Sequence, residues 1–253
     1  MSWNPEQYLK FADARRRPAR DLLARLGDIS PCSIVDLGCG AGNVTQLLAE
    51  RWPGARITGI DSDPAMLAKA AATALTIAWQ RADIATWRAS AAPDLIFSNA
   101  ALHWLGDHPH LFPRLLGELG AGGTLAVQMP ANFSAPSHRI LRELADEAPW
   151  REALAGVRMG SVLSAAQYQH LLLPHCRHLD LWETTYWQVL AGDDAVLEWL
   201  KGSTLLPYLA RLEATAAEGF VAACRARLTA AYPPGPDGRT PFPFQRLFFV
   251  AQR

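Results

Sequence analysis

Three glycines between Val35 and Asn43 could let the backbone pass close to a ligand. Gly38, Gly40 and Gly42 follow an apolar run, and glycine tolerates the positive φ angles that a tight strand-to-helix turn requires. An acidic residue, Asp61, ends the next apolar run. A carboxylate at that place can accept hydrogen bonds from both ribose hydroxyls of a nucleoside. The pattern therefore predicts a nucleoside cofactor.

The residues around the glycines separate two such cofactors. A dinucleotide site has the pattern G-x-G-x-x-G/A, in which the last position is a small residue that permits close helix–strand packing, and Asn43 stands at that position. Asp36 lies two residues before Gly38, where its charge would repel a pyrophosphate but attract a sulfonium or ammonium group. The loop therefore favours S-adenosylmethionine, and an NAD-dependent oxidoreductase is the alternative from a different class of enzyme.

The first half of the chain alternates between apolar runs and helical segments, which predicts a parallel sheet with helices on both faces. The second half is richer in helices and contains one long strand rich in Trp, Tyr and Thr. We interpret the helices between the last two strands as a cap over the ligand edge of the sheet. The expected strands are residues 33–37, 56–61, 77–81, 94–99, 124–129, 178–189 and 244–251; the expected helices are 43–52, 64–74, 108–118, 137–148, 165–173 and most of 193–232.

Several motifs in order, VDLGCGAGNVT, GIDSDPAML, AD and SNAALHWL, resemble the class I methyltransferase family over about residues 34–129. The resemblance implies an α/β fold with a doubly wound, mostly parallel seven-stranded Rossmann-like sheet and a helical cap. WNPEQYLKF, QMPAN and FPFQRLFFVAQR are similar to the members that act on trans-aconitate. This implies one methyltransferase domain over residues 1–253, with a helical lid segment at 1–28 and a helical cap at 190–235. It also implies a monomethyl ester on a small tricarboxylic acid, the expected substrate.

The same resemblance implies the cofactor residues. The glycines would line the methionine part, Asp61 would hold the ribose, and Asn99 and Ala100 would meet the methionine ammonium through the backbone. Met66 would lie against the adenine, and Asp83 and Ile84 would face its amino group and ring edge. The alternative for Met66 is an ordinary core position, and the alternative for Asp83 is a helix cap. The full set is Asp36, Gly38, Cys39, Gly40, Gly42, Asp61, Ser62, Met66, Asp83, Ile84, Asn99 and Ala100.

A carboxylate is already ionised at neutral pH, so methylating it needs no general base and we expect no catalytic residue. Arg246, expected near the start of the last strand and between two phenylalanines, could bind a second carboxylate with its two-pronged guanidinium group or form a structural ion pair. Trp104 could donate its indole N–H to a substrate carboxylate, because a buried Trp usually needs such a partner, or it could pack on the cap as a lid residue. The expected substrate residues are Trp3, Tyr8, Arg17, His103, Trp104, Tyr186 and Arg246.

Composition excludes other classes of function. Lys plus Arg and Asp plus Glu are equal at 24 each, so a general nucleic-acid binder is not expected. The four cysteines form no CxxC pair, no signal peptide or spanning segment is visible, and a cytoplasmic enzyme without an obligate protein partner is predicted. The spacing of His170, His175 and His178 does not suit a metal. Two alternative functions remain open. The chain could methylate an acid bound to a carrier protein, or it could be a regulator that binds S-adenosylmethionine without catalysis.

Overall fold

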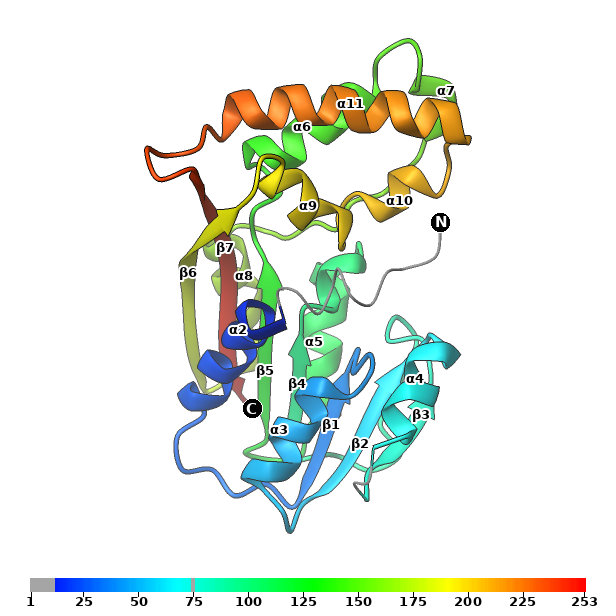
Figure 1. The fold of residues 1–253 in the computed structure, drawn as a ribbon. Coiled ribbons are helices and arrows are strands. Elements are labelled where there is room, and N and C mark those ends of the chain that lie inside the picture. The colour runs from blue at the N-terminus through cyan, green and yellow to red at the C-terminus, as the bar shows by residue number, and fades with distance from the viewer. Residues whose placement is uncertain (1–11, 74–75) are drawn as a thin grey trace. The chain divides into compact units, whose positions relative to one another are not determined.

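The computed structural model describes residues 12–73 and 76–253 (Figure 1). Seven strands within these residues form one sheet in the order β3-β2-β1-β4-β5-β7-β6. Strands β1 to β5 are parallel, and β7 is antiparallel to β5. This confirms the predicted fold class. The strands are β1 Ser33–Leu37, β2 Arg56–Asp61, β3 Ala78–Arg81, β4 Leu95–Asn99, β5 Thr124–Pro130, β6 His178–Ala191 and β7 Arg239–Gln252.

The chain consists of two compact units. The sheet unit contains Arg15–Pro130, Ser161–Thr184 and Arg246–Arg253, and the helical unit is built mainly from Ala131–Gly160 and Thr185–Gln245. Strands β6 and β7 each contribute residues to both units. The expected cap segment, residues 190–235, thus belongs to a larger helical unit that also includes residues 131–160.

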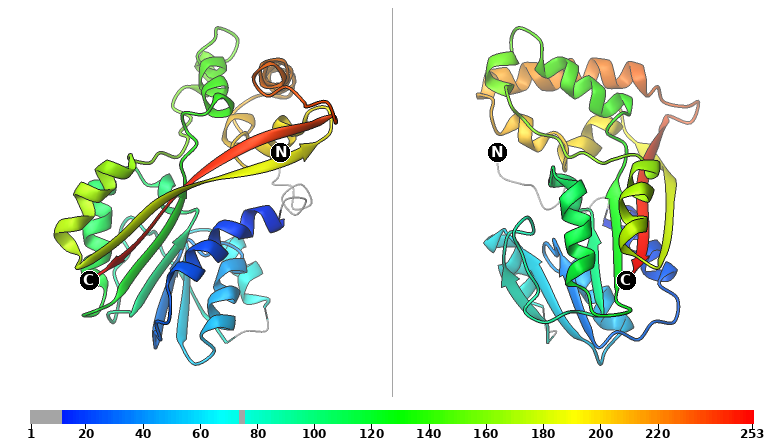
Figure 2. Two further views of the ribbon diagram at one scale, coloured as in Figure 1. Left: turned by 90° about the vertical axis from the view of Figure 1, so that its left-hand side faces the viewer. Right: turned by 180° about the vertical axis from the view of Figure 1, so that it is seen from behind.

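Helices cover both faces of the sheet in the sheet unit, with α2 and α3 on one face and α5 and α8 on the other (Figure 2). Phe112 of α5, Tyr168 of α8 and Phe249 of β7 pack edge to face or tilted, with ring centroids 5.2 to 5.9 Å apart. The helices and short turns of this unit are α2 Ala12–Arg25, α3 Asn43–Arg51, α4 Pro64–Ala71, η1 Leu102–Trp104, α5 His108–Glu118, α8 Ala165–Leu172 and η2 Leu173–His175.

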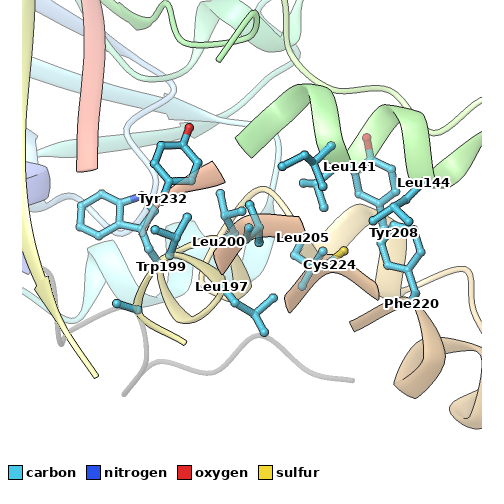
Figure 3. Close-up of a cluster of buried hydrophobic side chains, with 14 of the residues drawn as sticks. Leu141, Leu144, Leu197, Trp199, Leu200, Leu205, Tyr208, Phe220, Cys224 and Tyr232 are labelled. Atoms are coloured by element: carbon cyan, nitrogen blue, oxygen red, sulfur yellow. The ribbon is translucent and has the colours of Figure 1, made fainter. Parts of the chain in front are cut away.

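The helical unit has its own apolar core (Figure 3). Tyr208 and Phe220 stack with their rings 5.7 Å apart, and Trp199 contacts Phe242 of β7 at 5.9 Å. Burial of these side chains stabilises the helical unit through the hydrophobic effect. Its helices are α6 Pro136–Ala145, α7 Arg151–Leu154, α9 Ala195–Lys201, α10 Leu206–Leu209 and α11 Ala214–Ala231.

Local sequence explains where the helices near the ligand edge begin. Helix α4 has proline at its first position, where no N–H is needed, and Asp63 caps it by accepting the N–H of Ala65 at 2.7 Å. Helix α8 begins with a capping box between Ser164 and Gln167.

One strand boundary differs from the prediction in a way that concerns the site. Strand β7 begins at Arg239 rather than at 244, so Arg246 lies in the middle of the strand and not near its start. The prolines at 241 and 243 suggested a turn, but a strand tolerates proline wherever the N–H would not enter the ladder. Arg246 nevertheless pairs with Pro130, the last residue of β5, so it still lies at the carboxyl edge of the parallel strands.

None of the helices in the described part of the chain is long and apolar enough to cross a membrane.

Candidate active site

A cavity of about 260 Å³ opens at the carboxyl ends of β1, β2 and β4 in the sheet unit. In an open α/β sheet this edge is where ligands bind. Six of its lining residues were predicted as site residues, and Ala101 and Leu105 were not. The lining consists of Gly38, Asp61, Ser62, Asp83, Ile84, Ala101, Trp104 and Leu105.

The glycine loop needs its glycines for two different reasons. Gly38, Gly40 and Gly42 have φ angles of 77°, 54° and 80°, which favour glycine. At Gly38 a Cβ atom would lie 2.1 Å from the Cβ of Ala101, whereas at Gly40 it would meet nothing within 4 Å. Gly38 therefore permits close packing against the loop after β4, and Gly40 leaves space open.

Asp61 joins the end of β2 to this loop. One of its carboxylate oxygens, Oδ2, accepts the N–H of Gly40, and the other, Oδ1, accepts the N–H of Asp63, both at 2.9 Å. Each carboxylate oxygen can accept more than one hydrogen bond. Asp61 can therefore hold the loop and still accept the hydroxyls of a ribose in the cavity.

Asp36 lies beneath the loop and is 1% exposed. Thr45, in the first turn of α3, donates its hydroxyl to Oδ2 of Asp36 at 2.6 Å. Burial raises the pKa of Asp36 to about 7, the Thr45 hydrogen bond opposes this, and the charge of Asp61 adds to it. Burial likewise raises the pKa of the neighbouring Cys39 thiol, which therefore stays protonated at neutral pH.

Two further lining residues of the cavity suit a purine ring. Ile84 supplies an apolar wall, and the carboxylate of Asp83 accepts the N–H of Ala85 at 2.9 Å. No helix begins at Asp83, so the helix-cap alternative is wrong: Asp83 lies before a turn between β3 and β4. The turn occupies one oxygen of Asp83 and leaves acceptor capacity on its carboxylate. Met66 is half-buried on α4 and does not line the cavity, so its contact with an adenine stays a prediction.

The chain at the end of β4 has two unusual residues: a buried polar one, Asn99, and one with a strained backbone, Ala100. The side-chain Oδ1 of Asn99 is buried and has no hydrogen-bond partner among the described residues. Ala100 has a φ of 54°, the one positive value at a non-glycine residue in the described chain. A buried acceptor without a partner is costly, so Asn99 is prepared to accept a hydrogen bond from a bound donor such as an ammonium group.

The loop after β4 carries His103 and Trp104 on a single 3-10 turn. His103 is buried, and its carbonyl accepts the N–H of Ser161 at 2.8 Å. Trp104 is 56% exposed, which contradicts the premise that its indole is buried and must find a partner in the protein. It lines the cavity rim instead, so any contact with substrate would be made from the rim.

Arg246 is 7% exposed, and its Nη1 donates to Oε1 of Gln128 on the neighbouring strand at 3.5 Å. Gln128 pairs with Asn99 on one side and with Phe248 on the other. Because directly paired residues share a face of the sheet, Asn99, Gln128 and Arg246 lie on the same face, at the ends of adjacent strands.

The other predicted substrate residues are distributed differently. Arg17 is exposed on α2 of the sheet unit, and Tyr186 is buried in the helical unit. Trp3 and Tyr8 lie outside the described residues. The substrate roles of these four residues stay predictions.

No group of three or more His, Cys, Asp or Glu side chains in the described ranges is placed to hold a metal ion. His170, His175 and His178 are all exposed, on α8, η2 and β6.

Besides Ala101 and Leu105, two polar residues of the site were not predicted from the sequence. Thr45 faces Asp36 from the first turn of α3, and Gln128 lies in the QMPAN segment that was noted only as a motif. The available signal for Gln128 was an amide within an otherwise apolar strand, because a buried polar side chain needs a purpose.

Comparison with known proteins agrees with this geometry. A family model described as a methyltransferase domain matches residues 34–123. The trans-aconitate 2-methyltransferase of Azoarcus sp. is 50% identical over 253 residues, which cover 100% of this chain and 99% of that protein. The YcgJ protein of Bacillus subtilis superimposes with a TM-score of 0.62 at 13% identity, covering 93% of this chain and 97% of that one.

A phosphoethanolamine N-methyltransferase of Haemonchus contortus, solved with S-adenosylhomocysteine, has a TM-score of 0.55 at 16% identity and covers 93% of this chain and 52% of that one. Because both structures are remote in sequence, they establish the fold, whereas the relative from Azoarcus establishes the family. The chain belongs to the trans-aconitate 2-methyltransferase family.

Proposed function

We propose that this chain transfers the methyl group of S-adenosylmethionine to one carboxylate of trans-aconitate and so forms a monomethyl ester. The observation that carries the proposal is the 50% identity to a trans-aconitate 2-methyltransferase along the entire chain. The site supports it, because the glycine loop, Asp61 and the cavity at the ends of β1, β2 and β4 fit a nucleoside cofactor.

The residues present also fit the positively charged end of this cofactor. The buried Oδ1 of Asn99 accepts from an ammonium group, and Asp36 supplies a negative charge beneath the loop. Gly40 leaves room where a side chain would otherwise stand. A dinucleotide would bring two phosphates next to Asp36, which costs electrostatic energy.

When bound, the cofactor supplies an activated methyl group. The protein then has to orient the ionised carboxylate in line with the sulfur and to exclude water. Arg246 neutralises and orients a second carboxylate of the acid, and Trp104 bounds the cavity at its rim. The oxygen that attacks carries no proton, so no residue has to remove one.

The direct test is an assay with isotopically labelled S-adenosylmethionine against a panel of di- and tricarboxylic acids. Labelled trans-aconitate ester is the expected product. Turnover only with an acid bound to a carrier protein would show that the chain is a carboxyl methyltransferase with a different substrate. Binding of NAD in place of S-adenosylhomocysteine would overturn the proposal. Binding without turnover on any acid would identify a regulator.

Asp61→Ala is expected to weaken S-adenosylmethionine binding by about 2–4 kcal/mol, because the ribose loses a charge-assisted acceptor. Calorimetric titration of the folded variant measures this loss. Asp63→Ala is the matched control, because it removes a carboxylate two residues away that caps α4. If both variants lose the same affinity for S-adenosylmethionine, Asp61 does not bind the ribose directly and acts only through its negative charge or by supporting the loop.

His103→Gln is expected to keep most of the turnover, with the same flat rate profile between about pH 7 and pH 9 as the unaltered chain, because no general base is required. Steady-state rates across this range provide the measurement. A loss of several orders of magnitude that added imidazole restores would show that His103 carries a proton in the reaction.

A further inference from the structure

The side-chain amide of Gln128 has a partner for its oxygen but none for its nitrogen among the described residues. Gln128 is fully buried on β5, and its Nε2 has no hydrogen-bond partner among the described residues. Leaving a buried amide N–H unpaired typically costs about 1–3 kcal/mol. Because most buried polar groups are paired, an unpaired buried amide calls for a specific explanation, and a group supplied by a bound ligand is one.

The orientation of this amide follows from its neighbour. Arg246 has only donors on its guanidinium group, so the side of the amide that faces its Nη1 at 3.5 Å must be the oxygen. The nitrogen then lies on the opposite side of the amide and can donate two hydrogen bonds. The strand register places Gln128 beside Asn99 at the carboxyl edge of the sheet, where the cavity residues of the β4 loop also lie.

We propose that Gln128 is a specificity-determining residue, which holds the guanidinium of Arg246 through Oε1 and donates from Nε2 to the same non-reacting carboxylate of the acid. This inference rests on the proposed function and adds a residue to its substrate site. Arg246 supplies the charge, and Gln128 supplies a neutral donor whose direction the Arg246 contact fixes.

A neutral donor has an advantage at this position. The acceptor Oδ1 of Asn99 and the donor Nε2 of Gln128 are the two orphaned amide atoms on paired residues of β4 and β5. An acceptor suits the ammonium end of the cofactor, and a donor suits the carboxylate of the acid. The acceptor on β4 would therefore bind the ammonium group of the cofactor, and the donor on β5 would bind the carboxylate of the acid.

Gln128→Leu removes the donor and keeps a similar volume. We expect KM for trans-aconitate to rise about 10- to 100-fold, the scale for losing a hydrogen bond to a charged group. The KM for the dicarboxylic acid that lacks the recognised carboxylate should change less than threefold, and so should kcat and the affinity for S-adenosylhomocysteine. Gln128→Glu should raise KM for trans-aconitate further, because its carboxylate competes for Arg246 and repels the substrate.

Thr124→Val is the matched control, since it replaces another buried polar residue on β5 at the strand's opposite end. Its KM values should equal those of the unaltered chain. Thermal melting identifies a variant that is merely unstable, and Gln128→Met, which keeps the side-chain length, then takes the place of Gln128→Leu.

Two results overturn the inference and can be told apart. Turnover of trans-aconitate by the unaltered chain, with every acid affected equally by Gln128→Leu, removes Gln128 from substrate recognition and leaves the proposed function intact. Absence of turnover on any acid by the unaltered chain overturns the proposed function and this inference together.

Discussion

Arg246→Lys is expected to raise KM for trans-aconitate far more than KM for a dicarboxylic acid that lacks one of its non-reacting carboxylates. Lysine keeps the positive charge but loses the planar pair of donors that matches a carboxylate. Arg246 is 7% exposed and contacts Gln128, so little water is available to substitute for the lost donor. The recognition of one carboxylate should therefore depend on the shape of the guanidinium as well as on its charge.

Arg246→Ala should cost about 2–5 kcal/mol in kcat/KM for the tricarboxylic acid, the scale for breaking a buried charge pair. The affinity for S-adenosylhomocysteine should barely change, because Arg246 lies on β7, two strands beyond β4 in the order of the sheet. The loss would appear mainly in KM if the pair forms already in the ground state.

Steady-state kinetics on the two acids and thermal melting together decide this prediction. Arg253→Lys is the matched control, because Arg253 binds backbone carbonyls such as that of Gly117 at the other end of the sheet. If Arg246→Lys slows both acids to the same extent, or lowers the melting temperature as the main effect, Arg246 has a structural role and the substrate carboxylates are bound elsewhere.

Sequence alone predicted the alternating elements well, because the central strands such as β4 and β5 are apolar runs and helices such as α3 and α4 have Gly or Pro where they begin. It placed β1 and β2 with their observed bounds. It failed at the start of β7, where Pro241 and Pro243 indicated a turn. The strand there accommodates both prolines, and only the sheet pairing reveals which N–H groups are not needed.

The candidate site was predicted where a residue type is unusual for its local structure. Glycines before a helix and an acid at a strand end are visible without coordinates, and Gly38, Asp61 and Asp83 do line one cavity. Exposure is not visible in this way, so Trp104 was expected to be buried and is 56% exposed. Pairing across strands is not visible either, and for that reason the contact between Gln128 and Arg246 came only from the structure.

Asp36→Asn is expected to stabilise the ligand-free protein above pH 7 and to change its stability little near pH 4. The pKa of Asp36 is raised from 3.8 to about 7, chiefly by burial. Between these two values the folded chain holds a proton that the unfolded chain has released, so stability falls as pH rises from about 4 to 7 and then stays level. Asparagine is neutral throughout and does not lose this contribution.

The size of the effect follows from the separation of the two pKa values, which is worth on the order of 4 kcal/mol. Urea unfolding gives the free energy of unfolding of both proteins at pH 4.5 and pH 8. The change between the two pH values is compared for the two proteins, so that the contributions of the other titrating groups cancel. Thr45→Val is a useful companion variant, because the Thr45 hydroxyl stabilises the ionised carboxylate. Removing it should make the unaltered Asp36 more costly above pH 7 and have less effect at low pH.

Asp36→Asn should also weaken the binding of S-adenosylmethionine, because the ammonium and sulfonium groups of this cofactor favour the ionised form of Asp36. Binding to the unaltered protein just below pH 7 should therefore release a fraction of a proton, and affinity should rise with pH up to about 7. Calorimetry in two buffers of different ionisation enthalpy counts that proton, and Asp36→Asn should abolish its release. A variant that is more stable at pH 8 but binds the cofactor as tightly as before would show that Asp36 is a buried structural carboxyl. If stability and affinity change in opposite directions, the protein keeps a costly charge beneath the glycine loop because its ligand is a cation.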